Sequence, residues 1–119
     1  MTDNFPDYYK TFRKRMTDLN RAIPETMAGI GRLHSATMSS DGALDQKTKE
    51  LIALAIGISA HCDGCIVSHV RAALRAEAIR EEILETIGVA IFMGGGPSTV
   101  YGAEALQALN QFEGVPAAT

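Results

Sequence analysis

The sequence has no tryptophan, and its 119 residues include only two cysteines, four prolines and three histidines. Two cysteines are too few for the several cross-links of a small secreted scaffold held together by disulfides. The longest uncharged apolar run, residues 51 to 60, falls well short of the roughly 20 residues that span a bilayer. The first fifteen residues also lack the apolar segment of a secretory signal. We therefore expect a cytoplasmic protein with no membrane partner.

No charge of one sign dominates the chain. Eleven Lys and Arg residues stand against 14 Asp and Glu residues, and the net charge of −3 is spread with both signs interspersed. Nucleic acid is not an expected partner, because proteins that bind it gather basic side chains on one face. The length predicts a single domain, residues 1–119, since single cores of roughly 100 to 150 residues are the commonest size. No internal repeat or low-complexity tract divides it.

Helical periodicity is the main pattern that the sequence does contain. Apolar residues recur every three or four positions, and no stretch alternates as a half-buried strand does. The expected fold class is therefore all-α, with about six helices. Pro6 and Pro24 suit the first turns of the first two helices, and Asp45 suits the N-cap of the third. We expect the helices over about residues 6–21, 24–38, 46–60, 63–76, 83–92 and 98–112.

The apolar faces of these helices predict a core and an oligomer. The third helix is apolar nearly all round from Leu51, which predicts burial on all sides. A short chain arranges this more easily when a partner subunit covers one side, so we expect a homo-oligomer. Charged positions 10, 13, 14 and 15 are expected to form the solvated face of the first helix. The side chains expected to face inward are Tyr9, Phe12, Met16 and Leu19, then Met27, Ile30, Leu33, His34 and Met38, then Ile66, Val70, Ala73 and Leu74, then Ile83, Leu84, Ile87, Val89, Ala90, Ile91 and Phe92, and finally Tyr101, Ala105, Leu106, Leu109 and Phe112.

Two breaks between helices have a chemical reason. The fourth helix should end near Ala78, because its continuation would bury Glu77, Arg80 and Glu81 at a steep desolvation cost. Glycines 94 to 96 and the proline that follows are expected to end the fifth helix and open the last. They do not form a phosphate-binding loop, since no Lys and Ser or Thr follow at the required spacing. The tail, residues 114–119, is expected to fray.

The segment from His61 to His69 contains the residues most suited to chemistry. Cys62 and Cys65 form a CxxC pair at the expected start of the fourth helix, where unpaired N–H groups and the helix dipole favour a thiolate. His69 lies four residues after Cys65, on the same face of the helix. It lies seven residues after Cys62, about 10 Å along the helix axis. His69 is therefore expected to act on Cys65.

Glu50 is expected to complete this centre from the preceding helix. If the third and fourth helices form an antiparallel hairpin that turns near His61, Glu50 returns to about the level of His69. A carboxylate there would orient the imidazole and stabilise its protonated form. The sequence thus predicts a proton relay of Glu50, His69 and Cys65, with Cys62 as the second thiol.

Other interpretations of these residues stay open at this point. His61, Cys62, Cys65 and His69 are capable of surrounding one metal ion, although structural zinc sites usually combine two such pairs. Glu50 also fits a surface residue of a polar first turn. His61 fits a residue at a helix C-terminus, and His34 fits a structural histidine.

The stretch from Leu44 to Phe112, which contains Glu50, both cysteines and His69, resembles the carboxymuconolactone decarboxylase family. It is most similar to the alkylhydroperoxidase D-like members. The resemblance implies an all-helical fold assembled as trimers or hexamers. It also implies that peroxide oxidises Cys65 to a sulfenic acid, that Cys62 donates a proton and closes the disulfide, and that Glu50 and His69 relay protons.

The resemblance predicts a thiol-dependent peroxidase or disulfide reductase that takes a small peroxide or disulfide and is reset by an external dithiol. No metal or organic cofactor is expected. Three departures qualify this expectation. Gly64 stands where the best-known peroxidases have a histidine, and Glu77 and Arg80 replace a usual glycine and threonine. The decarboxylase itself acts without this dithiol. A lactone decarboxylase and a non-enzymatic redox or metal-binding subunit are the alternative functions.

Overall fold

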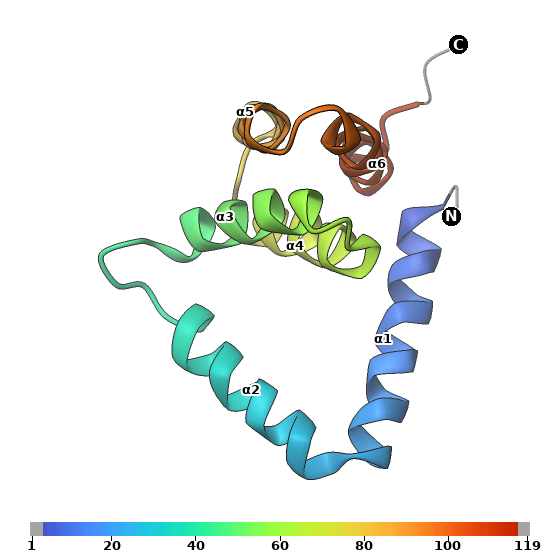
Figure 1. Ribbon diagram of the computed structural model, residues 1–119, viewed down its shortest axis with the longest axis vertical. Helices are drawn as coiled ribbons and strands as arrows, with labels where there is room; N and C mark the ends of the chain where they lie inside the picture. Colours follow the sequence, from blue (N-terminus) through green and yellow to red (C-terminus); the bar gives the residue numbers. More distant parts are fainter. Residues whose placement is uncertain (1–3, 117–119) are drawn as a thin grey trace.

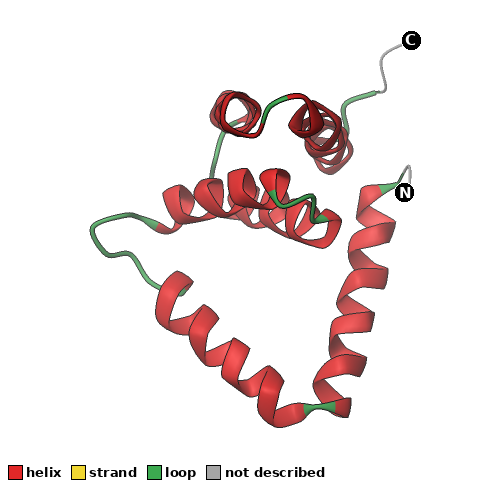
Figure 2. Ribbon diagram, viewed as in Figure 1, coloured by secondary structure: helices red, strands yellow, loops and turns green. Residues whose placement is uncertain are grey.

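The computed structural model describes residues 4–116, which form six helices and no strand within that range (Figures 1 and 2). The expected all-α fold class is therefore confirmed. The tail residues 117–119 lie outside the described range. The helices are α1 (Phe5–Ala22), α2 (Pro24–Met38), α3 (Gln46–Ser59), α4 (Asp63–Arg75), α5 (Arg80–Gly94) and α6 (Gly96–Glu113).

Local side-chain bonds explain where several helices begin. The Asp45 side chain accepts a hydrogen bond from the Thr48 N–H at 2.8 Å, which confirms the predicted cap of α3. α5 begins at Arg80, three residues before the position expected from apolar spacing. The Glu82 carboxylate accepts the Ile79 N–H at 2.9 Å and so satisfies a donor at this end. Polar residues of the first turn thus extend α5 beyond its apolar stripe.

The turn between α4 and α5 falls at the predicted break. The Ala78 N–H donates to the Ala73 carbonyl at 2.9 Å and the Glu77 N–H donates to the Leu74 carbonyl at 3.0 Å. These two bonds make a Schellman motif, in which the residue after the cap adopts a left-handed conformation. Glu77 does so with φ of 68°. The helix end therefore forms without the glycine that commonly occupies this place.

Helices α3 to α6 contain almost the whole core. α3 and α4 form a central antiparallel hairpin, and α5 and α6 pack across it (Figure 1). Their buried side chains remove apolar surface from water, which is the main favourable term in folding. The largest fully buried aliphatic side chains of these helices are Leu54, Ile58, Ile66, Val67, Val70, Ile83 and Leu109.

Helices α1 and α2 meet at Ile23 and splay apart as a wide V that stands away from this bundle; this pair is called the α1–α2 hairpin below (Figure 1). α1 is attached near its first residue: the Phe5 side chain is buried, and its N–H donates to the Gln111 side chain of α6 at 2.7 Å. α2 has no buried residue. The prediction that its apolar face points into the core is wrong within one chain, because Ile30 is 55% exposed and Leu33 is 63% exposed.

Other residues that were expected in the core are also exposed to solvent in the single chain. The prediction that α3 is buried on all sides is wrong within one chain, since Ile52 and Ile56 face out while Leu54 and Ile58 face in. Helical spacing identifies an apolar face, but it does not show whether the same chain covers that face. The remaining expected core residues that are exposed are Leu19, His34, Leu84, Val89, Phe92 and Leu106. Within the described part of the chain, no helix is long and apolar enough to cross a membrane.

Candidate dithiol active site

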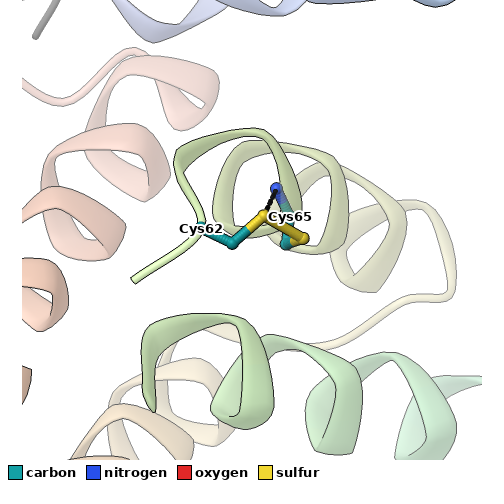
Figure 3. The surroundings of a disulfide bond; sticks show 2 residues. All are labelled: Cys62 and Cys65. Carbon is teal, nitrogen blue, oxygen red and sulfur yellow. Dashed lines mark hydrogen bonds between the residues drawn. A yellow bond between two sulfur atoms is a disulfide. The ribbon is translucent and has the colours of Figure 1, made fainter. Parts of the chain in front are cut away.

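The two cysteines form a disulfide at the start of α4 (Figure 3). Cys62 is the N-cap residue of the helix and Cys65 lies in its first turn, with their Cα atoms 5.2 Å apart. The Cys65 N–H donates to the Cys62 sulfur at 3.2 Å. Helix N-termini stabilise negative charge on such a sulfur. The pair is thus placed where its thiols and its disulfide can interconvert.

The end of α3 fixes the backbone that leads into this pair. The Cys62 N–H donates to the Gly57 carbonyl at 3.0 Å, and the His61 N–H donates to the Ile58 carbonyl at 3.1 Å. His61 has φ of 56°, and its ring stacks on Tyr101 of α6 with centroids 4.5 Å apart. His61 therefore closes α3 as a residue at the helix C-terminus, which is the position expected for it.

Glu50 and His69 meet as the hairpin geometry predicted. His69 Nδ1 lies 3.1 Å from Glu50 Oε1, and the two side chains are 24% and 12% exposed. A proton on Nδ1 satisfies the carboxylate and leaves Nε2 free to exchange a proton with another group. The juxtaposition is confirmed, while the role of the pair stays a prediction. Its link to Cys65 rests on the spacing of four residues along α4.

Gly57 allows α3 to approach Cys65 closely. A Cβ atom at this position would lie 3.1 Å from the Cys65 Cβ and 3.6 Å from the Cys65 carbonyl carbon. Such a contact is tighter than ordinary packing, so a side chain here would push α4 outward. The short distance between the helices keeps Glu50 within reach of His69.

Phe12 of α1 covers Gly64, the second of the two residues between the cysteines. A Cβ atom at Gly64 would lie 2.8 Å from Phe12 Cε1. A histidine at position 64 therefore requires Phe12 to move. The periodicity of α1 predicted Phe12 as a core residue, but it did not show that the ring lies over the CxxC turn.

Asp63 and Glu104 form a carboxyl pair beside the cysteines that sequence reasoning missed. Asp63 Oδ1 and Glu104 Oε2 are buried and accept no hydrogen bond from a donor among residues 4–116. Burial, followed by the neighbouring Asp63 carboxyl, raises the pKa of Glu104 to about 7. Near neutral pH a large share of the Glu104 carboxyls therefore keeps its proton. In sequence, Asp63 resembles an ordinary acidic residue of a first helical turn, and Glu104 resembles a surface residue.

A cleft of about 250 Å³ opens beside the Glu50–His69 pair. It lies between α1, α2 and the faces of α3 and α4, and a neighbouring hollow of about 390 Å³ shares His34, Glu50 and Arg75 with it. His34, expected to be structural, thus lines the cleft. The cleft is also lined by Tyr9, Phe12, Arg13, Ser68, His69, Arg71 and Ala72. Substrate atoms placed in it would reach the histidine directly.

The geometry gives no support to a shared metal site. Among the described residues, no group of three or more His, Cys, Asp or Glu side chains is arranged to hold a metal ion. His61, one of the four possible ligands, has its ring stacked on Tyr101.

An all-helical chain with a disulfide-forming CxxC pair and an adjoining Glu–His pair belongs to the class of small helical dithiol proteins. Residues 24–108 match the model of the carboxymuconolactone decarboxylase family. The chain belongs to this family, as its resemblance to the alkylhydroperoxidase D-like members indicated.

Two solved structures of family members have the same fold, and a further relative is similar in sequence. The chain is 38% identical over 102 residues to an uncharacterized protein from Cupriavidus necator, covering 79% of this chain and 88% of that protein. A carboxymuconolactone decarboxylase family protein from Legionella pneumophila superposes with a TM-score of 0.87 and 43% identity, over 93% of this chain and 98% of that one. A Thermotoga maritima family member, for which a part in an antioxidative response has been suggested, superposes with a TM-score of 0.75 and 26% identity over 92% and 99% of the two chains.

Proposed function

We propose that the protein is a thiol-dependent peroxidase or disulfide reductase that works through Cys62 and Cys65. The observation that carries this proposal is the Cys62–Cys65 disulfide at the N-terminus of α4, one helical turn before a histidine paired with a carboxylate. The suggested antioxidative role of the Thermotoga maritima relative supports the same chemistry. The dithiol cycle fits the cytoplasmic location that the sequence predicts, because thiols are kept reduced there.

With a hydroperoxide, the reaction has two steps at the thiols. The Cys65 thiolate attacks the peroxide, so that an S–O bond forms, the O–O bond breaks and an alcohol leaves after taking up a proton. Cys62 then attacks the sulfenic sulfur of Cys65, forming the S–S bond and releasing water. The dithiol loses two electrons and two protons, which appear in the alcohol and the water.

Glu50 and His69 act as the proton relay for Cys65 in this proposal. His69 removes the thiol proton and returns a proton to the leaving oxygen, while Glu50 holds the ring through the 3.1 Å contact to Nδ1. An external dithiol then reduces the disulfide through a mixed disulfide and resets the enzyme. No metal or organic cofactor takes part.

In this proposal, Gly64 affects the balance between peroxide reduction and disulfide reduction. Phe12 occupies the space that a histidine between the cysteines would need, so the peroxide step has the imidazole of the Glu50–His69 relay but no second one at position 64. Reduction of a disulfide substrate needs only the dithiol and its thiolate. Peroxide reduction and disulfide reduction thus make different demands on position 64, so we propose to measure both on the same protein.

Stopped-flow mixing of the reduced protein with cumene hydroperoxide, and separately with an aromatic disulfide, tests the proposal. We expect loss of two thiols per chain with at least one of the two oxidants, and none of this fast phase in Cys65→Ser. Thiol loss at the rate of Cys65→Ser with both oxidants would overturn the proposal.

A lactone decarboxylase that uses Glu50 and His69 is the second candidate, because the family includes this reaction. It predicts that turnover of a carboxylated lactone survives in the double variant Cys62→Ser, Cys65→Ser. A non-enzymatic metal-holding role predicts stoichiometric zinc in protein purified under reducing conditions. Either result, together with inert thiols, would replace the dithiol proposal.

Assembly as a homotrimer or homohexamer of this single-domain chain is part of the proposal. It is supported by large apolar side chains that one chain leaves exposed to solvent, such as Ile56 of α3 and Phe92 and Met93 of α5 at 63%, 83% and 75% exposure. Patches of this kind usually mark contacts between proteins. Sedimentation velocity of the wild type and of Phe92→Lys tests this, because the charged variant should dissociate; a monomeric wild type would contradict it.

A further inference from the structure

The cleft beside His69 is rich in positive charge. Arg13 of α1 and both Arg71 and Arg75 of α4 line it. Among the described residues of its wall, Glu50 is the single carboxylate, and it is already paired with His69. The chain as a whole carries a net charge of −3. The local charge of the cleft is therefore opposite in sign to that of the protein.

Among the residues that the structure describes, these three guanidinium groups have no carboxylate partner. Within residues 4–116, the basic side chains that lie within 4.0 Å of a carboxylate are Lys47, His69 and Arg80. The Arg71 Nε is buried and donates to no acceptor within the same range. A buried donor without an acceptor is unfavourable. A bound anion would supply the missing acceptor.

Aromatic rings hold two of the arginines in place. The Arg71 guanidinium lies 5.0 Å from the centre of the Tyr9 ring and 5.7 Å from that of Phe112. Arg13 lies 5.9 Å from the same Tyr9 ring and donates to its hydroxyl at 3.2 Å. Such contacts fix the planar groups before a ligand arrives, which lowers the entropy lost on binding. They also bring two positive charges to one ring, and an anion between them relieves the repulsion.

We propose that this cleft binds the carboxylate of the substrate and so orients its reactive S–S or O–O bond toward the dithiol. The planar guanidinium groups match a carboxylate through paired hydrogen bonds. The identity of the reacting bond rests on the proposed function, whereas the anion subsite rests on the arginines alone. The substrate class is therefore an acidic disulfide or an acidic hydroperoxide.

A binding measurement tests the subsite independently of thiol chemistry. The oxidised protein is titrated with benzoate and with its neutral analogue benzamide, and binding is followed by NMR. We expect benzoate to bind at least about tenfold more tightly, and Arg71→Gln and Arg75→Gln each to weaken it by about ten- to a hundredfold. Arg75 is exposed, so its variant stays informative even if Arg71→Gln disturbs folding. Arg21→Gln, an exposed change in the last turn of α1, is the matched control and should leave binding unchanged.

A kinetic measurement tests the substrate class. The reduced protein reacts with 5,5′-dithiobis(2-nitrobenzoate), which carries two carboxylates, and with the uncharged 4,4′-dithiodipyridine. We divide the rate constant for the dicarboxylate by that for the uncharged disulfide. This ratio should fall at least about tenfold in Arg75→Gln and should not change in Arg21→Gln. Equal binding of benzoate and benzamide, or equal effects of Arg75→Gln and Arg21→Gln, would overturn the subsite. Selective benzoate binding with inert thiols would uphold the subsite while refuting the proposed function.

Discussion

The α3–α6 bundle and the α1–α2 hairpin contain similar apolar residues but bury them very differently. Leu54 of α3 has no exposed surface, whereas Leu33 of α2 is 63% exposed. Phe5 is the one residue of the hairpin that is fully buried, yet the hairpin also supplies Phe12 over Gly64 and Tyr9 and Arg13 in the wall of the cleft. The bundle thus carries the stability of the chain and the two cysteines, while the hairpin shapes access to them.

Replacing one leucine in each region tests this difference in burial, and it has the largest expected effect on stability. Leu54→Ala removes a fully buried side chain and should lower the free energy of unfolding by about 2 to 5 kcal/mol. Leu33→Ala should change it by no more than about 0.5 kcal/mol in the monomer. Urea unfolding at low protein concentration measures both. Equal costs would mean that α2 belongs to the core.

Removing the charge of Glu50 tests whether the bundle alone provides the relay. Glu50→Gln should slow thiol oxidation by roughly a hundredfold, because the neutral amide is a weaker acceptor for His69 Nδ1 and holds the ring less firmly than the carboxylate does. Glu85→Gln, an exposed change on α5, is the control and should have no effect. The rates come from stopped-flow mixing with cumene hydroperoxide. A rate in Glu50→Gln equal to that of the control would remove Glu50 from the mechanism.

The contact between Phe12 and Gly64 joins the two regions, and a double-mutant cycle measures it. Gly64→Ala should cost about 1 to 3 kcal/mol of stability, because its Cβ would lie 2.8 Å from Phe12 Cε1. In a Phe12→Ala background the same change should cost clearly less, since the space is then free. Additive costs in denaturant unfolding would show that the hairpin does not press on the CxxC turn.

The pair of Asp63 and Glu104 gives the smallest expected effect, which depends on pH. Burial and the neighbouring Asp63 raise the pKa of Glu104 from 4.5 to about 7, so the folded protein keeps a proton that the unfolded chain has lost. Stability is therefore full below about pH 4.5 and falls as the pH rises through about 7. We expect a loss of about 1 kcal/mol, because solvent screens a partly exposed group. Glu104→Gln should flatten this part of the pH profile, and an unchanged slope would contradict the assignment.

The sequence predicted the helices and the meeting of Glu50 with His69, because both follow from spacing along a helix and from the reversal near His61. It did not predict that Leu33 and Phe92 face solvent, since an apolar face carries no information about what covers it. The contact of Arg71 with the Tyr9 and Phe112 rings was not predicted either, because it joins three helices, α1, α4 and α6, that are far apart in the sequence. Gly64 was recognised as unusual in sequence, but only the position of Phe12 explains it.

Trapping the oxidised sulfur tests the central claim, that Cys65 and not Cys62 attacks the substrate. Attack by Cys62 is the alternative, because the Cys65 N–H donates to the Cys62 sulfur and favours negative charge there. Single-serine variants are treated with cumene hydroperoxide and dimedone, and the adduct is located by mass spectrometry. We expect a rapid adduct at Cys65 in Cys62→Ser and little adduct in Cys65→Ser. A rapid adduct at Cys62 in Cys65→Ser, with none at Cys65 in the other variant, would contradict it.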